Sequence, residues 1–273
     1  MINTLNESQL HKALKTFYAV QFSAQEEVKV ERWYCDLVCP DGGIVEIQTK
    51  NVGALKEKIA GLLKSGRRVT VVHPIIKEKI IETYSEDGTL ASRRKSPKKE
   101  SLWSELREFT ALTEILLQKK FSLLLPEITM AEKRIQSPEA QQAKNGRRRY
   151  KKAWQKTDKA LLTIGATYKM NGKKDWLGLL PKEILEAAKA PAKKAVRKAA
   201  KPVDGAGPAK SADGQPQPFC AATIREIYLK EKNCAAAQNA NLILWLLRKA
   251  GLIVRVPHPG RGFFYVWSRH ASL

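Results

Sequence analysis

Two carboxylates lie close together in the sequence, in segments that both have the pattern of a strand. Asp36 stands between apolar residues, and after a turn at residues 40–43 polar residues alternate with apolar ones. The alternating polar residues are Glu46, Gln48 and Lys50. Successive side chains of a strand point to opposite faces, so these three are expected on one face, with Asp36 brought alongside by the turn. Paired carboxylates suit Mg²⁺ or Mn²⁺, and a metal held this way activates water for phosphodiester hydrolysis.

The segments around these carboxylates switch between the helical and the strand period. A helix is predicted over residues 6–18, with a capping box formed by Asn6 and Gln9. A second helix is predicted from Asn51 to its end at Gly66. Strands are predicted at 28–33, 34–39, 44–50 and 68–73. The expected order for residues 6–75 is therefore α-β-β-β-α-β.

The pattern of Asp36, nine residues and then Glu46-Ile47-Gln48 resembles the PD-(D/E)xK nuclease superfamily. This resemblance implies a restriction-endonuclease-like αβββαβ core with the metal on Asp36 and Glu46. Two departures are visible: Cys35 stands where the motif has Pro, and Gln48 stands where Lys is usual. Lys50 is expected on the same face, where it offers a replacement cation.

The first helix of that superfamily often adds a polar residue to the site. Glu7, His11 and Lys15 have the spacing of such a stripe on one helical face. The candidate catalytic set is therefore Asp36, Glu46, Gln48, Lys50 and His11. The alternatives are a salt-bridged sheet edge for the two carboxylates and an ordinary surface histidine for His11.

The chain is also similar, over most of its length, to a bacterial protein family, and this resemblance implies no activity. The matching segments are residues 10–11, 14–15, Asp36, 46–50, 73–75 and 93–98.

A large excess of positive charge points to a polyanionic partner. The chain has 49 Lys and Arg against 27 Asp and Glu, a net charge of +22, which attracts phosphate backbones. We expect nucleic acid, DNA before RNA, with a solvated basic surface as the alternative. The candidate contacts are Arg93, Arg94, Lys95 and Lys98 on a loop, the cluster Arg147, Arg148, Arg149, Lys151 and Lys152, and Arg261 in a hairpin tip.

Composition divides the chain into four predicted parts. Residues 1–135 form the nuclease-like α/β domain, including a hairpin near 80–92 and a helix at 102–117. Residues 136–186 are a basic helical extension, and residues 187–218, rich in Ala, Lys and Pro, are a disordered linker. Residues 219–273 read as helices followed by a hairpin, a small winged-helix-like α+β domain.

Several classes of site and location are disfavoured. The cysteines lack the paired spacing of a zinc site. The longest uncharged stretch, residues 233–247, is too short to span a membrane, and the start has no signal-peptide pattern. A cytoplasmic location is expected, and homodimer formation is left open. Three function classes stay open: a metal-dependent nuclease, an inactive nuclease-like DNA-binding regulator, and a structural or interaction protein.

Overall fold

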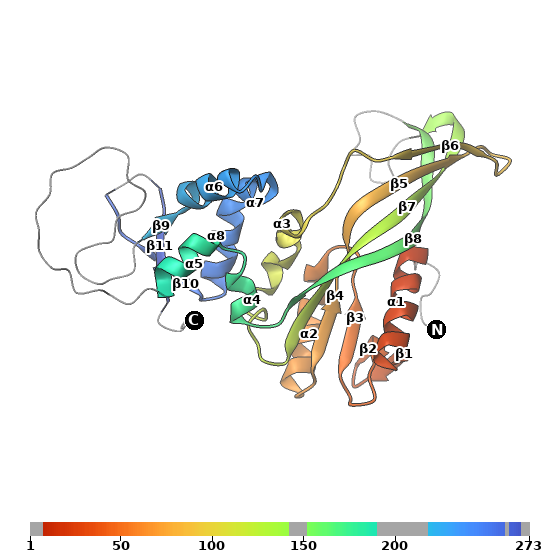
Figure 1. Ribbon diagram of the computed structural model, residues 1–273. Coiled ribbons are helices and arrows are strands. Elements are labelled where there is room, and N and C mark those ends of the chain that lie inside the picture. Colours follow the sequence, from red (N-terminus) through yellow and green to blue (C-terminus); the bar gives the residue numbers. More distant parts are fainter. Residues whose placement is uncertain (1–7, 142–151, 190–217, 260–261, 269–273) are drawn as a thin grey trace, which may run out of the picture. The chain divides into compact units, whose positions relative to one another are not determined.

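The computed structural model describes residues 8–141, 152–189, 218–259 and 262–268 (Figure 1). The chain divides into two compact units. Unit 1 comprises residues 1–112 and 119–170, and unit 2 comprises residues 113–118 and 171–273. Among the described residues, no helix combines the length and the apolar character needed to cross a membrane.

Unit 1 begins with the element order that the sequence predicts. Its first six main elements are α1 (Gln9–Phe22), β1 (Gln25–Val30), β2 (Trp33–Val38), β3 (Ile44–Ile47), α2 (Lys56–Lys64) and β4 (Val69–Val72), with a 3-10 turn η2 (Val52–Leu55) before α2. Ser8, and not Asn6, caps α1, because its side chain accepts a hydrogen bond from the His11 amide. Gly66 follows α2 with φ of +81°, the left-handed conformation that commonly ends a helix.

The second half of unit 1 is dominated by long strands. It contains β5 (Ile75–Tyr84), β6 (Leu90–Lys95), α3 (Leu102–Glu105), the 3-10 helix η3 (Leu106–Leu112), β7 (Phe121–Gln141) and β8 (Lys152–Met170). The hairpin predicted near 80–92 is present as β5 and β6. The predicted helix at 102–117 is shorter and mostly 3-10, because the regular α-helix ends at Glu105.

These strands form one mixed sheet in which β7 is the central strand. The order is β1-β2-β3-β4-β7-β5-β6, and β8 also pairs with β7. Along one edge β7 pairs in parallel first with β4 and then with β5, whereas β8 lies antiparallel along its other edge. β3 and β4 are parallel, and β1, β2 and β3 form an antiparallel meander. The fold of unit 1 is therefore of the mixed α/β class.

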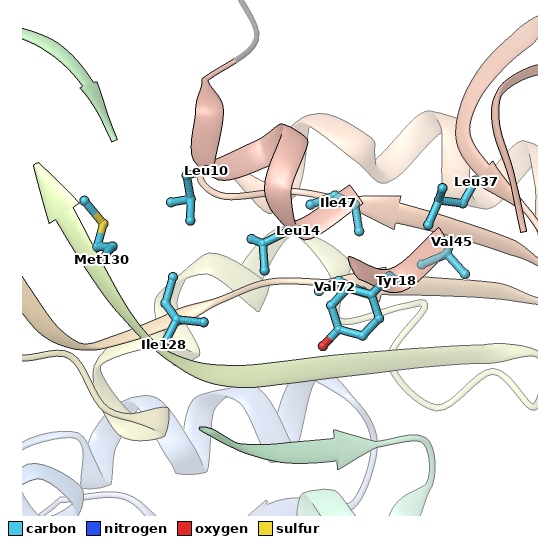
Figure 2. Packing of buried hydrophobic residues seen from close by; sticks show 9 residues of the cluster. All are labelled: Leu10, Leu14, Tyr18, Leu37, Val45, Ile47, Val72, Ile128 and Met130. Atoms are coloured by element: carbon cyan, nitrogen blue, oxygen red, sulfur yellow. The ribbon is translucent and has the colours of Figure 1, made fainter. Parts of the chain in front are cut away.

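Helices cover the two faces of this sheet. α1 lies on one face, where Leu10, Leu14 and Tyr18 pack against strand residues (Figure 2). The strand residues of this core cluster are Leu37, Val45, Ile47, Val72, Ile128 and Met130. Glu46 alternates with Val45 and Ile47 and contacts Lys58 of α2, so α2 lies on the opposite face.

Unit 2 contains short helices and a small antiparallel sheet. The helices are α4 (Lys173–Leu177), α5 (Lys182–Lys189), α6 (Ala221–Lys230), α7 (Cys234–Gln238) and α8 (Ala240–Lys249). The strands are β9 (Phe219–Cys220), β10 (Ile253–Val256) and β11 (Phe264–Trp267), in the order β10-β11-β9. The Tyr228 hydroxyl donates a hydrogen bond to the Leu179 carbonyl, which joins α6 to the segment after α4.

Two of the predicted boundaries are wrong. The helical extension expected at 136–186 is instead a strand over residues 152–170, and helices follow only from Lys173. The first domain does not end at 135, because β8 pairs along most of β7 and keeps residues up to Met170 in unit 1. The predicted linker lies almost wholly outside the described residues.

Candidate functional site

The carboxylate of Asp36 on β2 accepts a hydrogen bond from a backbone amide of β3, where a carbonyl of the neighbouring strand would ordinarily be the acceptor. β2 and β3 pair through Leu37 with Val45 and Val38 with Ile44. Two residues beyond Val45 on β3, the Ile47 amide donates a hydrogen bond of 2.7 Å to Oδ2 of Asp36. The side chain of Asp36 keeps 25% of its surface exposed. Asp36 is thus held in place while part of its carboxylate faces solvent.

Glu46 is a buried carboxylate with one satisfied oxygen. Its residue is 2% exposed, and Oε2 lies 2.5 Å from Nζ of Lys58. Oε1 is buried and no donor of the described residues reaches it with hydrogen-bond geometry, although the Asp36 amide and the Cys35 thiol also interact with this carboxylate. Burial, reinforced by repulsion from Asp36 and opposed by Lys58, raises the pKa of Glu46 to about 7. A buried oxygen without a partner is costly, so this position favours a bound cation or a proton.

The thiol next to this carboxylate is kept neutral. Cys35 is 1% exposed, and burial, followed by repulsion from Glu46, raises the pKa of its thiol to about 12. Since the thiolate is the reactive form, Cys35 is not a nucleophile at neutral pH. It fills the space beside Glu46 as a small apolar residue, as its sequence context suggests.

The first turn of α1 brings His11 to Asp36. Nε2 of His11 lies 3.8 Å from Oδ2 of Asp36. The predicted stripe of helix residues does not continue, because Lys15 is 4% exposed and its ammonium pairs with Glu27 at 2.8 Å. Glu7 lies outside the described residues. Of the stripe, the structure therefore places His11 at the candidate site.

Glu46, Gln48 and Lys50 do not share one face, because β3 ends at Ile47 and the two-residue alternation ends with it. The Gln48 side-chain amide donates to the carbonyl oxygens of Lys50 and Asn51, at 2.5 and 3.3 Å. The Gln48 carbonyl lies 2.6 Å from Nδ1 of the buried His73. Gln48 is thus part of a turn, and His73 fixes the end of β3.

A cluster of cations surrounds a second buried carboxylate on the long strands. Glu132 of β7 is 1% exposed and accepts hydrogen bonds from Lys156 at 2.6 Å and from Arg134 at 2.8 Å. Nζ of Lys79 lies 3.6 Å from the same carboxylate. Burial acts to raise the pKa of Glu132, but the hydrogen bonds from Lys156 and Arg134 outweigh it and lower that pKa to about 2. Glu132 therefore stays ionised.

Lys50 extends the cation cluster toward the end of β3. It lies close enough to Lys159 of β8 to repel it, and Lys159 is opposite Glu132 in the pairing of β7 with β8. Burial, followed by repulsion from Lys50, lowers the pKa of Lys159 to about 8. We call the group Lys50, Lys79, Arg134, Lys156, Lys159 and Glu132 the Glu132 cluster.

The predicted contacts at residues 93–98 lie mostly on a strand and not on a loop. Arg93, Arg94 and Lys95 belong to β6 and are exposed. Arg93 pairs with Glu82 at 3.2 Å and Lys95 pairs with Glu78 at 3.1 Å. The antiparallel pairing of β6 with β5 extends to Lys95, opposite Ile80, which is why these cations are strand residues. Lys98 follows the strand and lies 3.6 Å from Glu100.

The other predicted nucleic-acid contacts lie outside the described residues. These are Arg147, Arg148, Arg149, Lys151 and Arg261, together with the side chain of Lys152, whose backbone begins β8.

Sequence reasoning did not single out Lys58 or Lys159. Lys58 reaches Glu46 only once α2 packs on the sheet. Lys159 lies at the end of a basic stretch, residues 144–159, for which the sequence leaves open both a solvated helix face and a phosphate-binding patch. The alternation of Thr, Ile and Tyr in residues 163–168 was a usable signal for a strand at β8.

The described residues offer two oxygen-donating side chains to a divalent metal. No group of three or more His, Cys, Asp or Glu side chains within the described ranges is placed to hold a metal ion. Asp36 and the free Oε1 of Glu46 fit the preference of Mg²⁺ for one or two carboxylates, with water and substrate phosphate completing the shell. The residues therefore fit an open magnesium site and not a closed structural one.

Unit 1 is a mixed α/β domain, and its candidate site contains Asp36 and the buried Glu46, with a cluster of cations around Glu132 on the same sheet. The sequence profile of a domain of unknown function, DUF8091, matches residues 8–171, and the chain belongs to that family. An uncharacterized protein of Treponema pallidum (strain Nichols) is 35% identical over 172 residues, which are 63% of this chain and 65% of that protein. The match thus spans less than two thirds of the relative. No solved structure matches the chain.

Proposed function

We propose that this protein binds nucleic acid, DNA before RNA, and that Asp36 and Glu46 form a metal-dependent phosphodiesterase site in it. The observation that carries the proposal is the state of Glu46, a buried carboxylate coupled to Asp36 with one oxygen lacking a partner. A divalent cation would satisfy that oxygen and offset the repulsion between the two carboxylates.

The residues around this pair have distinct expected roles. When bound, Mg²⁺ or Mn²⁺ polarises a phosphate and lowers the pKa of a water. Lys58 orients Glu46 through the 2.5 Å ion pair and supplies a cation where Gln48 replaces the usual lysine. His11 lies 3.8 Å from Asp36 and contributes to its orientation. Lys50 lies on the Glu132 cluster side and contributes to phosphate binding.

The topology supports a restriction-endonuclease-like core. The order α1-β1-β2-β3-α2-β4 is the αβββαβ order that the resemblance implies. In this chain β1, β2 and β3 form an antiparallel meander, and β3 and β4 are parallel. In unit 2, helices α6 to α8 with the sheet of β9, β10 and β11 support a winged-helix-like reader of DNA. A cytoplasmic location belongs to the same proposal.

A specific observation favours a second candidate, a nuclease-like DNA-binding regulator without activity. The Lys58 ammonium already neutralises one oxygen of Glu46, and Gln48 brings no charge. In that case the family domain would bind DNA and leave it uncut.

The deciding experiment compares cleavage and metal binding in matched variants. Glu46→Gln removes the metal ligand with little change in shape. Glu127→Gln removes a carboxylate that pairs with Lys77 on the same sheet and serves as the control. We expect wild type and the control to cut plasmid, linear or single-stranded DNA with Mg²⁺ or Mn²⁺, and Glu46→Gln to bind DNA without cutting it.

Metal titration by calorimetry accompanies the cleavage time course. If wild type binds neither ion and leaves every substrate whole while it still binds DNA, catalysis at Asp36 and Glu46 is refuted. The regulator is then the better description.

A further inference from the structure

The Glu132 cluster contains more positive charge than its carboxylate can neutralise. Lys79, Arg134 and Lys156 all lie within 3.6 Å of Glu132. The Arg134 guanidinium lies 3.6 Å from the centre of the Trp154 ring, which fixes its plane. These contacts order the cations around one buried anion, and an ordered set of cations loses little entropy when it binds a further anion.

Lys159 and Lys50 are two further cations at the edge of the Glu132 cluster, and they repel each other. The attraction of Glu132 for Lys159 is smaller than the repulsion from Lys50. Lys159 is half-buried on β8, directly opposite Glu132 in the pairing of β7 with β8, so the sheet holds its backbone at the cluster. An anion between Lys159 and the exposed Lys50 would relieve the repulsion.

The position of the cluster adds to its attraction for anions. Ile128 and Met130 of β7 pack under α1 (Figure 2). By the two-residue alternation of a strand, Glu132 is the next residue on the same side. The Gln9 amide, in the first turn of α1, donates a hydrogen bond of 3.2 Å to Asp158 of β8. The N-terminal, positive end of the α1 dipole therefore lies against β8 beside Lys159. Asp158 accepts the Gln9 hydrogen bond, so part of its negative charge is already engaged by this helix end.

We propose that Lys50, Lys156 and Lys159 form a binding site for one phosphate group, supported by Lys79, Arg134 and Glu132. Lys156 and Lys50 are exposed, so the site opens to solvent and takes a phosphate carried by a larger molecule. If the proposed function holds, the bound phosphate is a phosphodiester of the nucleic-acid backbone, and this part of the inference rests on that proposal. Free inorganic phosphate presents the same charged oxygens.

The proposed phosphate site and the candidate metal site both lie at the N-terminal end of α1. His11 of the first helical turn contacts Asp36, and Lys50 follows the end of β3 that Asp36 holds. A strand bound at the Glu132 cluster is thus tethered beside Asp36 by a phosphate other than the one that reacts. Binding at the cluster does not depend on a metal, which separates its test from the test of cleavage.

The test measures binding by the full chain in metal-free buffer. One arm follows a short DNA duplex by fluorescence anisotropy over a range of salt, and the other follows inorganic phosphate by ³¹P NMR. The variants are Lys50→Gln, Lys159→Gln and the double variant. The control is Lys77→Gln, which removes an exposed cation of β5 that pairs with Glu127. Circular dichroism checks folding, which Lys159→Gln should preserve because burial disfavours its charge.

We expect each single variant to bind the duplex about tenfold more weakly, the size of one charge-assisted contact. The double variant should lose less than the product of both, because the two lysines hold one phosphate. For duplex binding, the negative slope of log K against log salt concentration should become shallower by about 0.9, the change expected when one phosphate contact is lost. The control should stay within about twofold of wild type, and phosphate binding should be lost with Lys159→Gln.

The outcomes separate the two proposals. A wild type that binds duplex while both lysine variants behave like the control overturns the phosphate site and leaves DNA binding standing. Binding of phosphate that is lost in Lys159→Gln, with no duplex binding at all, supports the site and overturns the proposed function. Binding of neither ligand overturns both.

Discussion

Replacing the carboxylate at the centre of the Glu132 cluster should destabilise unit 1 strongly. In Glu132→Gln the largely buried Lys79 ammonium and Arg134 guanidinium lose the carboxylate that pairs with them, and the exposed Lys156 loses it as well. Breaking a buried ion pair from one side typically costs about 3–5 kcal/mol, because the remaining charges stay buried without compensation.

The pKa of Glu132 gives an independent magnitude and a pH window. This pKa is about 2 in the fold against 4.5 for an ordinary Glu, a difference that corresponds to about 3 kcal/mol. A lowered carboxyl pKa stabilises the fold above the unfolded pKa, and the stabilisation is lost as pH falls toward the folded pKa. The difference between wild type and variant should therefore be constant near neutral pH and shrink below pH 4.5.

Urea unfolding with hydrogen exchange on peptides of β7 and β8 measures this difference in unit 1 itself. Glu82→Gln is the control, because Glu82 pairs with the exposed Arg93 on the neighbouring strand β5, and such a pair contributes less than about 1 kcal/mol. The reasoning is refuted if Glu132→Gln costs no more than Glu82→Gln at neutral pH, or if its cost stays constant down to pH 3.

Three further predictions concern the core, the site and the cysteines. Leu14→Ala, which opens a cavity under α1, should lower the free energy of unfolding by about 2–5 kcal/mol in urea titration, whereas Val20→Ala, at a position 78% exposed on the same helix, should change it by less than about 0.5 kcal/mol. Gln48→Lys should not speed metal-dependent cleavage in a time course, because the Gln48 side chain binds the turn carbonyls of Lys50 and Asn51 and does not share the face of Glu46; a faster reaction would contradict that placement. Iodoacetamide should label the exposed Cys234 in the native protein and reach Cys35 only after unfolding, because burial keeps that thiol protonated; mass spectrometry of the labelled peptides would expose early reaction at Cys35.

The elements from α1 to β4 could be predicted because their patterns are local. Alternation marks β2 and β3, the helical period marks α1 and α2, and Gly66 marks the end of a helix. The turn at residues 40–43 predicts that Asp36 lies alongside the following strand, where its carboxylate accepts a hydrogen bond from the Ile47 amide. These features depend on residues that are neighbours in the sequence.

The parts that could not be predicted depend on contacts between distant segments. Lys58 meets Glu46 only once α2 packs on the sheet, and Lys159 meets Lys50 only once β8 pairs with β7. Basic residues at the start of β8 hide its alternation. A run of lysines has the same composition in a helix, a strand or a coil, so composition does not tell these apart. The strand assignment at Gln48 and Lys50 failed because the Gln48 amide binds the following turn.

The pairing of β7 on both edges decides which fragments of this protein can be handled in isolation. A fragment that ends near residue 135, where composition first suggests a boundary, would lack β8 and leave the edge of β7 from Leu123 to Ile135 without a partner. Unpaired strand edges with apolar residues recruit other chains and aggregate. A fragment that ends after Met170 keeps that edge closed, so soluble expression should depend on a segment that lies beyond the candidate site in the sequence and contributes none of its carboxylates.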